Sequence, residues 1–188
     1  TRYEKGRTLN FFATKVFPRQ MAKIINENDN DAMVDIFLSA GAVDLSDAIT
    51  DKLQFDYKNF ISRRNDSLFK IVDHPGVRHL YYFPITPRKI CNGRLCERFP
   101  KYSNKEWISL ANVCIAKING ANPQFHSKLK LVPFSFDIHQ CIANDGIHLT
   151  DKGKYLLLNS VFKSEEKQMF SPDDFPPLCS HISKKSPL

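Results

Sequence analysis

The chain has 188 residues, of which 42% are hydrophobic and 25% are charged, and it carries a net charge of +7 with a pI of about 9.2. This length and composition are typical of one globular domain with a sizeable core. No apolar stretch of the sequence is long enough to span a bilayer. The positive charge permits an acidic partner such as nucleic acid, but it does not identify one.

The cysteine content bears on the compartment and on metal binding. Five cysteines, at positions 91, 96, 114, 141 and 179, form neither an even nor a dense set, so we expect reduced thiols in an intracellular, cytoplasmic protein. Secretion stays open, because the chain begins with Thr1 and a cleaved signal peptide is compatible with that start. A Cys91–Cys96 disulfide also stays open. A zinc site needs two further ligands, so we expect no metal.

The hydrophobic pattern predicts helices that alternate with buried strands. The first helical segment has a break or a new start at Pro18, and a short apolar run before Gly41 is typical of a buried parallel strand. A long loop rich in Pro, Arg and Cys follows the second strand. In chain order, the sequence predicts helices over 8–27, 104–119 and 150–162, helical segments within 47–72, strands over 33–40, 77–83 and 129–134, and a long loop over 84–102.

Strands that alternate with helices predict an α/β fold with a mainly parallel sheet. In such sheets, ligands bind beyond the carboxyl ends of the strands. Three polar or glycine-containing segments fall at those ends, namely Gly41–Asp44, Pro84–Arg88 and Asp145–His148. We therefore expect them to meet in one domain, formed by residues 1–163. The segment 164–188 is predicted to be an irregular tail that contains prolines.

Asp145 stands three residues before His148, in a loop that leads directly into the last predicted helix. In hydrolases that use a serine nucleophile, a histidine acts as general base and a carboxylate fixes its tautomer. The spacing lets one turn carry both groups, so Asp145 and His148 are candidate catalytic residues. The alternative is a helix-capping loop with a histidine on the surface, because so short a pattern also arises by chance.

Over residues 5–162 the chain resembles the SGNH, or GDSL-type, hydrolase superfamily. The resemblance rests on Asp145–His148, on Gly41–Asp44 in place of the family's Gly-x-Asn-Asp block, and on the Pro-Arg loop after the second strand. Gly6 falls where the family places an oxyanion-hole glycine. The resemblance implies a three-layer α/β/α sandwich and an esterase that acts on small ester or acylated substrates without a cofactor.

The chain departs from the family pattern at two positions. It contains no Gly-Asp-Ser block, so the nucleophilic serine lies upstream of Thr1 or has been lost, and neither Ser39 nor Ser46 stands in a nucleophile turn. Val43 occupies the oxyanion asparagine position, and the loss of one oxyanion donor costs about 10²–10³ in rate. We expect Asp44 to cap the helix after the first strand instead of acting as an acid.

Two functional hypotheses remain open. The first is an ester hydrolase or deacylase, in which Gly6, Gly41 and the Val43 position line the oxyanion site. Arg88 would then meet an anionic group of the substrate, unless it is a solvated loop residue. The second is a catalytically degenerate domain that binds a protein or nucleic-acid partner through its basic surface. Val43 favours weak or absent catalysis and therefore the second hypothesis.

Overall fold

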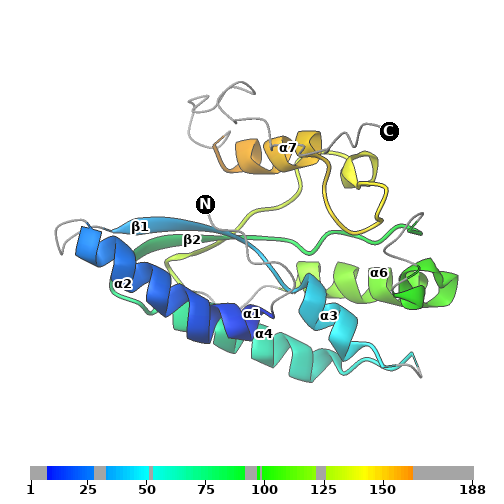
Figure 1. The fold of residues 1–188 in the computed structure, drawn as a ribbon, viewed down its shortest axis with the longest axis horizontal. Coiled ribbons are helices and arrows are strands. Elements are labelled where there is room, and N and C mark those ends of the chain that lie inside the picture. The colour runs from blue at the N-terminus through cyan, green and yellow to red at the C-terminus, as the bar shows by residue number, and fades with distance from the viewer. Residues whose placement is uncertain are drawn as a thin grey trace, which may run out of the picture.

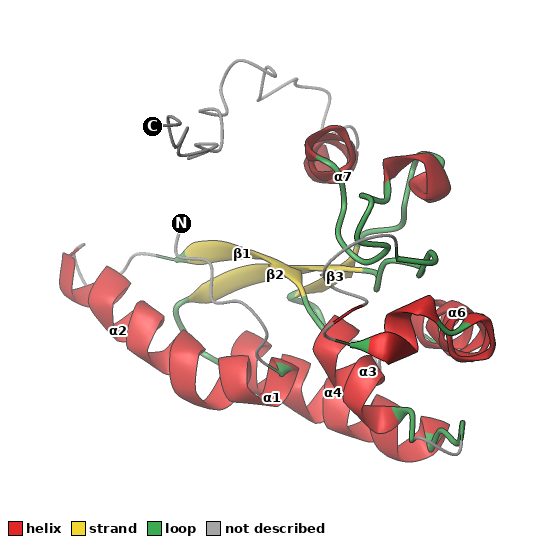
Figure 2. Cartoon of the chain, turned by 45° about the vertical axis from the view of Figure 1, so that its right-hand side comes forward, coloured by secondary structure: helices red, strands yellow, loops and turns green. Residues whose placement is uncertain are grey.

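The computed structural model describes residues 8–27, 33–50, 53–91, 97, 99–121 and 126–162. Its sheet contains β1 (Val34–Ser39), β2 (Val77–Phe83) and β3 (Leu129–Leu131), in the spatial order β1-β2-β3. Both strand pairs are parallel, and Figure 2 labels the three strands. The α/β class and the parallel sheet predicted from the sequence are therefore confirmed.

Helices cover both faces of this sheet. Figures 1 and 2 show α1, α2 and α4 along one face and α7 above the other, with α3 and α6 toward the end where the strands terminate. This arrangement is a three-layer α/β/α sandwich. The helices are α1 (Leu9–Phe11), a π-helical turn (Phe12–Val16), α2 (Phe17–Glu27), α3 (Ala42–Ala48), α4 (Tyr57–Val72), α6 (Lys105–Gly120) and α7 (Asp151–Phe162), with 3₁₀ turns at Pro100–Ser103 and Ile138–Cys141.

Alternation along the strands separates the two cores. On β2, Leu80 and Tyr82 face α1, α2 and α4, whereas Phe83 packs with Val132 and the α7 residue Leu157 on the opposite face. The burial of these side chains supplies the main stabilisation of the sheet. A third core, around Leu45, Trp107 and Ile115, joins α3 to α6 at the end of the sheet where the candidate site lies.

One predicted boundary is confirmed and others were wrong, for identifiable reasons. The new helix start expected at Pro18 is present, because α2 begins at Phe17 with Pro18 as its second residue, although the helical path from the π turn is continuous. The helix after β1 begins at Ala42 and not at Asp47, because Gly41 adopts a left-handed φ of 102° and turns the chain at once. β3 ends at Leu131, three residues early. The tail 164–188 lies outside the described residues.

Two asparagines on α6 hold the segment that follows β2. The side chain of Asn119 accepts from the Ile85 N–H and donates to the Ile85 carbonyl, both at 2.9 Å. Asn112 makes the same pair of bonds with the backbone of Arg88, at 2.7 and 3.0 Å. These residues are seven apart, so they project from the same side of the helix. These bonds satisfy the backbone groups of Ile85 and Arg88 without a neighbouring strand.

Candidate functional site

The three segments predicted to meet at the carboxyl ends of the strands do meet. Arg88 Nη2 donates to the Ala42 carbonyl at 2.9 Å, which joins the segment after β2 to the turn after β1. The next residue, Lys89, donates its N–H to the Gly146 carbonyl at 3.0 Å and so reaches the loop of Asp145. These bonds position the loop after β3 beside the loops after β1 and β2, as in other open α/β sheets.

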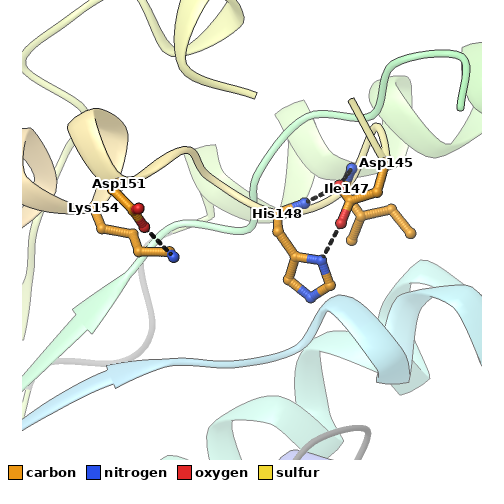
Figure 3. A network of polar contacts seen from close by, with 5 residues as sticks. All are labelled: Asp145, Ile147, His148, Asp151 and Lys154. Carbon is orange, nitrogen blue, oxygen red and sulfur yellow. Dashed lines mark hydrogen bonds and ion pairs between the residues drawn. The ribbon is translucent and has the colours of Figure 1, made fainter. Parts of the chain in front are cut away.

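Asp145 and His148 form a closely bonded pair. Their side chains point toward each other, and the His148 Nδ1 to Asp145 Oδ2 distance is 2.6 Å (Figure 3). The other carboxylate oxygen, Oδ1, accepts the N–H of Ile147 at 3.0 Å and the N–H of His148 at 2.9 Å. The Asp151–Lys154 ion pair lies apart from them in the same view. The carboxylate thus orients both the loop and the imidazole.

The loop that carries this pair is closed by backbone bonds. Ala143 donates to the His148 carbonyl at 2.8 Å, Gly146 donates to Ala143, and Ile142 forms an antiparallel bridge with Leu149. Gly146 has a φ of 72°, and a Cβ at this position would overlap the Lys89 carbonyl. Only glycine combines this left-handed backbone with so close an approach. Residue 146 therefore determines how the pair is presented.

The electrostatics of the pair suit a histidine base. Burial alone would raise the pKa of Asp145, but the hydrogen bonds from the His148 backbone, the His148 ring and the Ile147 N–H outweigh it and hold that pKa below its usual range. The carboxylate is therefore ionised at neutral pH and favours a proton on Nδ1. The His148 side chain is 56% exposed, and its Nε2 makes no hydrogen bond to any described residue. This nitrogen is free to accept a proton from an incoming hydroxyl.

Neither of the serines considered from the sequence is bonded to His148. Ser46 is buried in α3, where it donates to the Ala42 carbonyl at 3.0 Å and accepts from the Tyr102 hydroxyl at 3.3 Å. Ser39 is exposed at the end of β1. Within the part of the chain that the structure describes, no serine, threonine or cysteine side chain is hydrogen-bonded to the His148 ring.

The structure bears differently on the three residues predicted to line the oxyanion site. Gly6 lies outside the described residues. Gly41 follows β1 and precedes α3, and a Cβ there would stand 3.0 Å from Ile85 Cδ1 and 3.2 Å from the Tyr82 hydroxyl, so the position requires glycine. Val43 is the second residue of α3 and is only partly buried, and its side chain offers no hydrogen-bond donor.

Asp44 caps a different helix from the one expected. Its Oδ2 accepts the N–H of Leu9, the first residue of α1, at 2.9 Å, so it joins α3 to the start of the chain's first helix. Burial raises the pKa of Asp44, although that hydrogen bond opposes the shift. Asp44 also lines a cavity of about 230 Å³ between α1, α3 and α4. Gly41 lines the cavity too, but Asp145 and His148 do not.

Arg88 is buried, with 3% of its surface exposed, and so the expectation of a solvated loop arginine was wrong. Its backbone is held by Asn112 on α6, a residue that sequence analysis missed. A signal was present, because Asn112 and Asn119 repeat at a helical spacing of seven on the face that packs against the strand segment. Two partly buried polar residues at that spacing indicate bonds to a neighbouring backbone.

Searches for a membrane span, for a metal site and for similar proteins each give a negative result within the described residues or the sequence. No helix in the described ranges is long and apolar enough to cross a membrane. Among those same residues, no three His, Cys, Asp or Glu side chains are grouped to hold a metal ion. Cys96 and any bond it makes lie outside them. Comparison with protein-family models, with curated proteins and with solved structures gives no match.

Proposed function

We propose that this domain is an SGNH-like ester hydrolase or deacylase in which His148 is the general base and Asp145 positions it. The observation that carries the proposal is the 2.6 Å contact between His148 Nδ1 and Asp145 Oδ2, with Nε2 exposed at the carboxyl end of a parallel sheet. A carboxylate, an oriented imidazole and an available nitrogen at the ligand-binding edge are what acyl transfer from an ester requires. The substrate class is a small ester or an acylated molecule.

In this mechanism, Nε2 removes the proton of a serine hydroxyl as its oxygen attacks the ester carbonyl carbon. The imidazolium that forms is stabilised by Asp145, and its proton then passes to the departing alcohol oxygen as the ester C–O bond breaks. A water molecule then attacks the acyl-enzyme carbonyl as Nε2 takes its proton. The acid is released, and the proton returns to the serine oxygen. In this proposal the serine comes from upstream of Thr1, where the family resemblance implies it. The missing donor at Val43 predicts a slow enzyme, by about 10²–10³.

The test measures hydrolysis of p-nitrophenyl acetate by the protein expressed with the sequence that precedes Thr1 and by its His148→Ala variant. We expect the variant to lose about 10²–10⁴-fold in rate, which is the usual contribution of a general base. The matched control is His79→Ala, because His79 also contacts a carboxylate, Asp35, at 3.2 Å but lies on the face of β2. Equal losses in both variants, or hydrolysis that His148→Ala leaves intact, would contradict the proposal.

A binding function is the second candidate. The observations that favour it are the net charge of +7 and the absence of a hydroxyl or thiol bonded to His148 among the described residues. A basic domain without a nucleophile would hold a nucleic acid through its phosphates. Filter binding of single- and double-stranded nucleic acid over a salt series tests this, because phosphate contacts make affinity fall steeply with salt. A flat salt response would exclude such contacts.

A further inference from the structure

Two arginines are buried in the described part of the chain, and they differ in how their nitrogens are satisfied. Arg64, 5% exposed, donates from Nη1 to the Ile118 carbonyl at 2.8 Å, from Nη2 to the Ala121 carbonyl at 3.1 Å, and from Nε to the Asn65 side chain at 3.3 Å. All three of its nitrogens therefore have acceptors. Arg64 is accounted for by helix packing alone.

Arg88, 3% exposed, has an acceptor for only one nitrogen. Nη2 bonds to the Ala42 carbonyl, but Nε and Nη1 are buried without any partner. An unpaired buried donor costs about 1–3 kcal/mol, and more when the group is charged. No carboxylate is bonded to this guanidinium, and burial lowers its pKa while the nearby oxygens of Tyr102 and Asp145 oppose that shift. The two nitrogens therefore have unused donor capacity among the described residues, and their charge favours an anionic acceptor.

The position of Arg88 relates those nitrogens to the candidate site. Its side chain reaches the turn after β1 through Ala42, and its neighbour Lys89 bonds to Gly146 in the loop of Asp145 and His148. Asn112 holds the backbone of Arg88 through its N–H and carbonyl, and the bond from Nη2 to Ala42 holds the guanidinium end. Asp145 acts on the guanidinium through its charge but is not hydrogen-bonded to it, because its carboxylate oxygens bond to Ile147 and His148.

We propose, resting on the esterase function above, that the site takes esters whose acyl group carries an anion, with a carboxylate bound by Arg88 Nε and Nη1. An arginine presents its donors in a planar fork that matches a carboxylate. Both nitrogens are buried, so a carboxylate bound to them is held away from water. The specificity of the site would follow from this charge and not from a shaped apolar pocket.

The test compares hydrolysis of mono-p-nitrophenyl succinate, whose acyl group ends in a carboxylate, with that of p-nitrophenyl acetate. The readout is the ratio of the two kcat/KM values. We expect Arg88→Met to lower that ratio about 10–100-fold, as the loss of charged hydrogen bonds implies, and Arg88→Lys to lower it less. Arg64→Met is the matched control: it removes a buried but fully bonded arginine, and we expect the ratio to stay as in the unmodified chain.

The outcomes separate the two proposals. If the chain hydrolyses acetate through His148 but Arg88→Met leaves the ratio unchanged, the inference about Arg88 is overturned while the esterase function stands. If the chain hydrolyses neither ester, the proposed esterase function fails. The inference that Arg88 binds a carboxylate is then tested by the binding of succinate. We then expect succinate, at constant ionic strength, to raise the Tm of the unmodified chain and of Arg64→Met but not of Arg88→Met. Equal changes in Tm for the unmodified chain and the two variants would overturn the inference about Arg88.

A folding control keeps the test decisive. Circular dichroism shows whether Arg88→Met retains the helical signal of the unmodified chain. Should it not fold, Asn112→Ala takes its place, because it releases the backbone of Arg88 without removing the guanidinium. For this positioning residue we expect KM for the succinate ester to rise about 3–10-fold with little change in kcat, as a loss of ground-state binding does. An unchanged KM would count against the proposal.

Discussion

Two of the three Asp–His pairs among the described residues lie in different parts of the fold and have different neighbours. Asp145 and His148 occupy a loop at the carboxyl end of the sheet, 2.6 Å apart. Asp35 and His79 lie side by side on β1 and β2, 3.2 Å apart, and Asp35 is also bound by Arg78 through both carboxylate oxygens, at 3.0 and 2.5 Å.

The difference shows that the other partners of the carboxylate decide what a pair can do. The hydrogen bond from Arg78 is the largest cause of the lowered pKa of Asp35, so that carboxylate already has a permanent counter-charge. Asp145 is held by backbone N–H groups and by the imidazole alone, and it can therefore stabilise a charge that appears on His148. Only the second arrangement supports general-base chemistry.

The sharpest way to break this comparison is to neutralise each carboxylate. We expect Asp145→Asn to lower p-nitrophenyl acetate hydrolysis about 10²–10⁴-fold, because an amide no longer fixes the required tautomer or stabilises the imidazolium. Asp35→Asn should leave the rate within a factor of two or so, since its pair lies on the sheet face. The measurement is kcat/KM at neutral pH. If the two variants lost the same activity, the two pairs would not differ as described.

A second prediction concerns the loop that presents the catalytic pair. Gly146→Ala should destabilise the domain by about 2–4 kcal/mol, because the new Cβ meets the Lys89 backbone at a left-handed φ. Gly120→Ala is the control: no atom stands within 4 Å of its Cβ, so stability should hold or rise slightly. Urea unfolding midpoints measure both. Equal midpoints would mean that the loop tolerates a different backbone.

A third prediction sharpens the contrast at Asp35. Arg78→Met removes the strongest cause that lowers the pKa of Asp35, so this pKa should rise toward its ordinary value of about 3.9. The pKa of Asp145 should stay below its usual range, because its own hydrogen bonds are untouched. Carboxyl ¹³C chemical shifts followed over a pH titration report both groups. Movement of both, or of neither, would show that the two sites are not independent.

The smallest expected effect is on stability in acid. Both aspartates have lower pKa values in the folded chain, so each contributes stability above the unfolded value of about 3.9 and loses it as the pH falls through the folded value. Unfolding midpoints should therefore change little from pH 7 to 5 and fall below about pH 4. Asp145→Asn and Asp35→Asn should each flatten that decline. A decline centred near pH 6 would point to histidines instead.

How far the sequence predicts this structure depends on the range of the interaction involved. β1, β2, α6 and α7 follow from local periodicity, and the Asp145–His148 bond follows from a spacing of three residues. The burial of Arg88 and the capping of α1 by Asp44 depend on segments that are distant in sequence, with 46 and 35 positions between the bonded residues. No local pattern encodes those contacts. The left-handed Gly146 was likewise visible only as a glycine, and its reason is the Lys89 carbonyl.

The paired asparagines of α6 also require two segments to match in length, namely 112–119 of the helix and 85–88 after β2. From Asn112 to Asn119 the helix advances by roughly 10.5 Å, at about 1.5 Å per residue, and from Ile85 to Arg88 an extended chain advances by roughly 10 Å. Insertion or deletion of a single residue in either stretch would leave at least one amide facing the wrong backbone group. This part of the chain should therefore accept substitutions far more readily than changes in length.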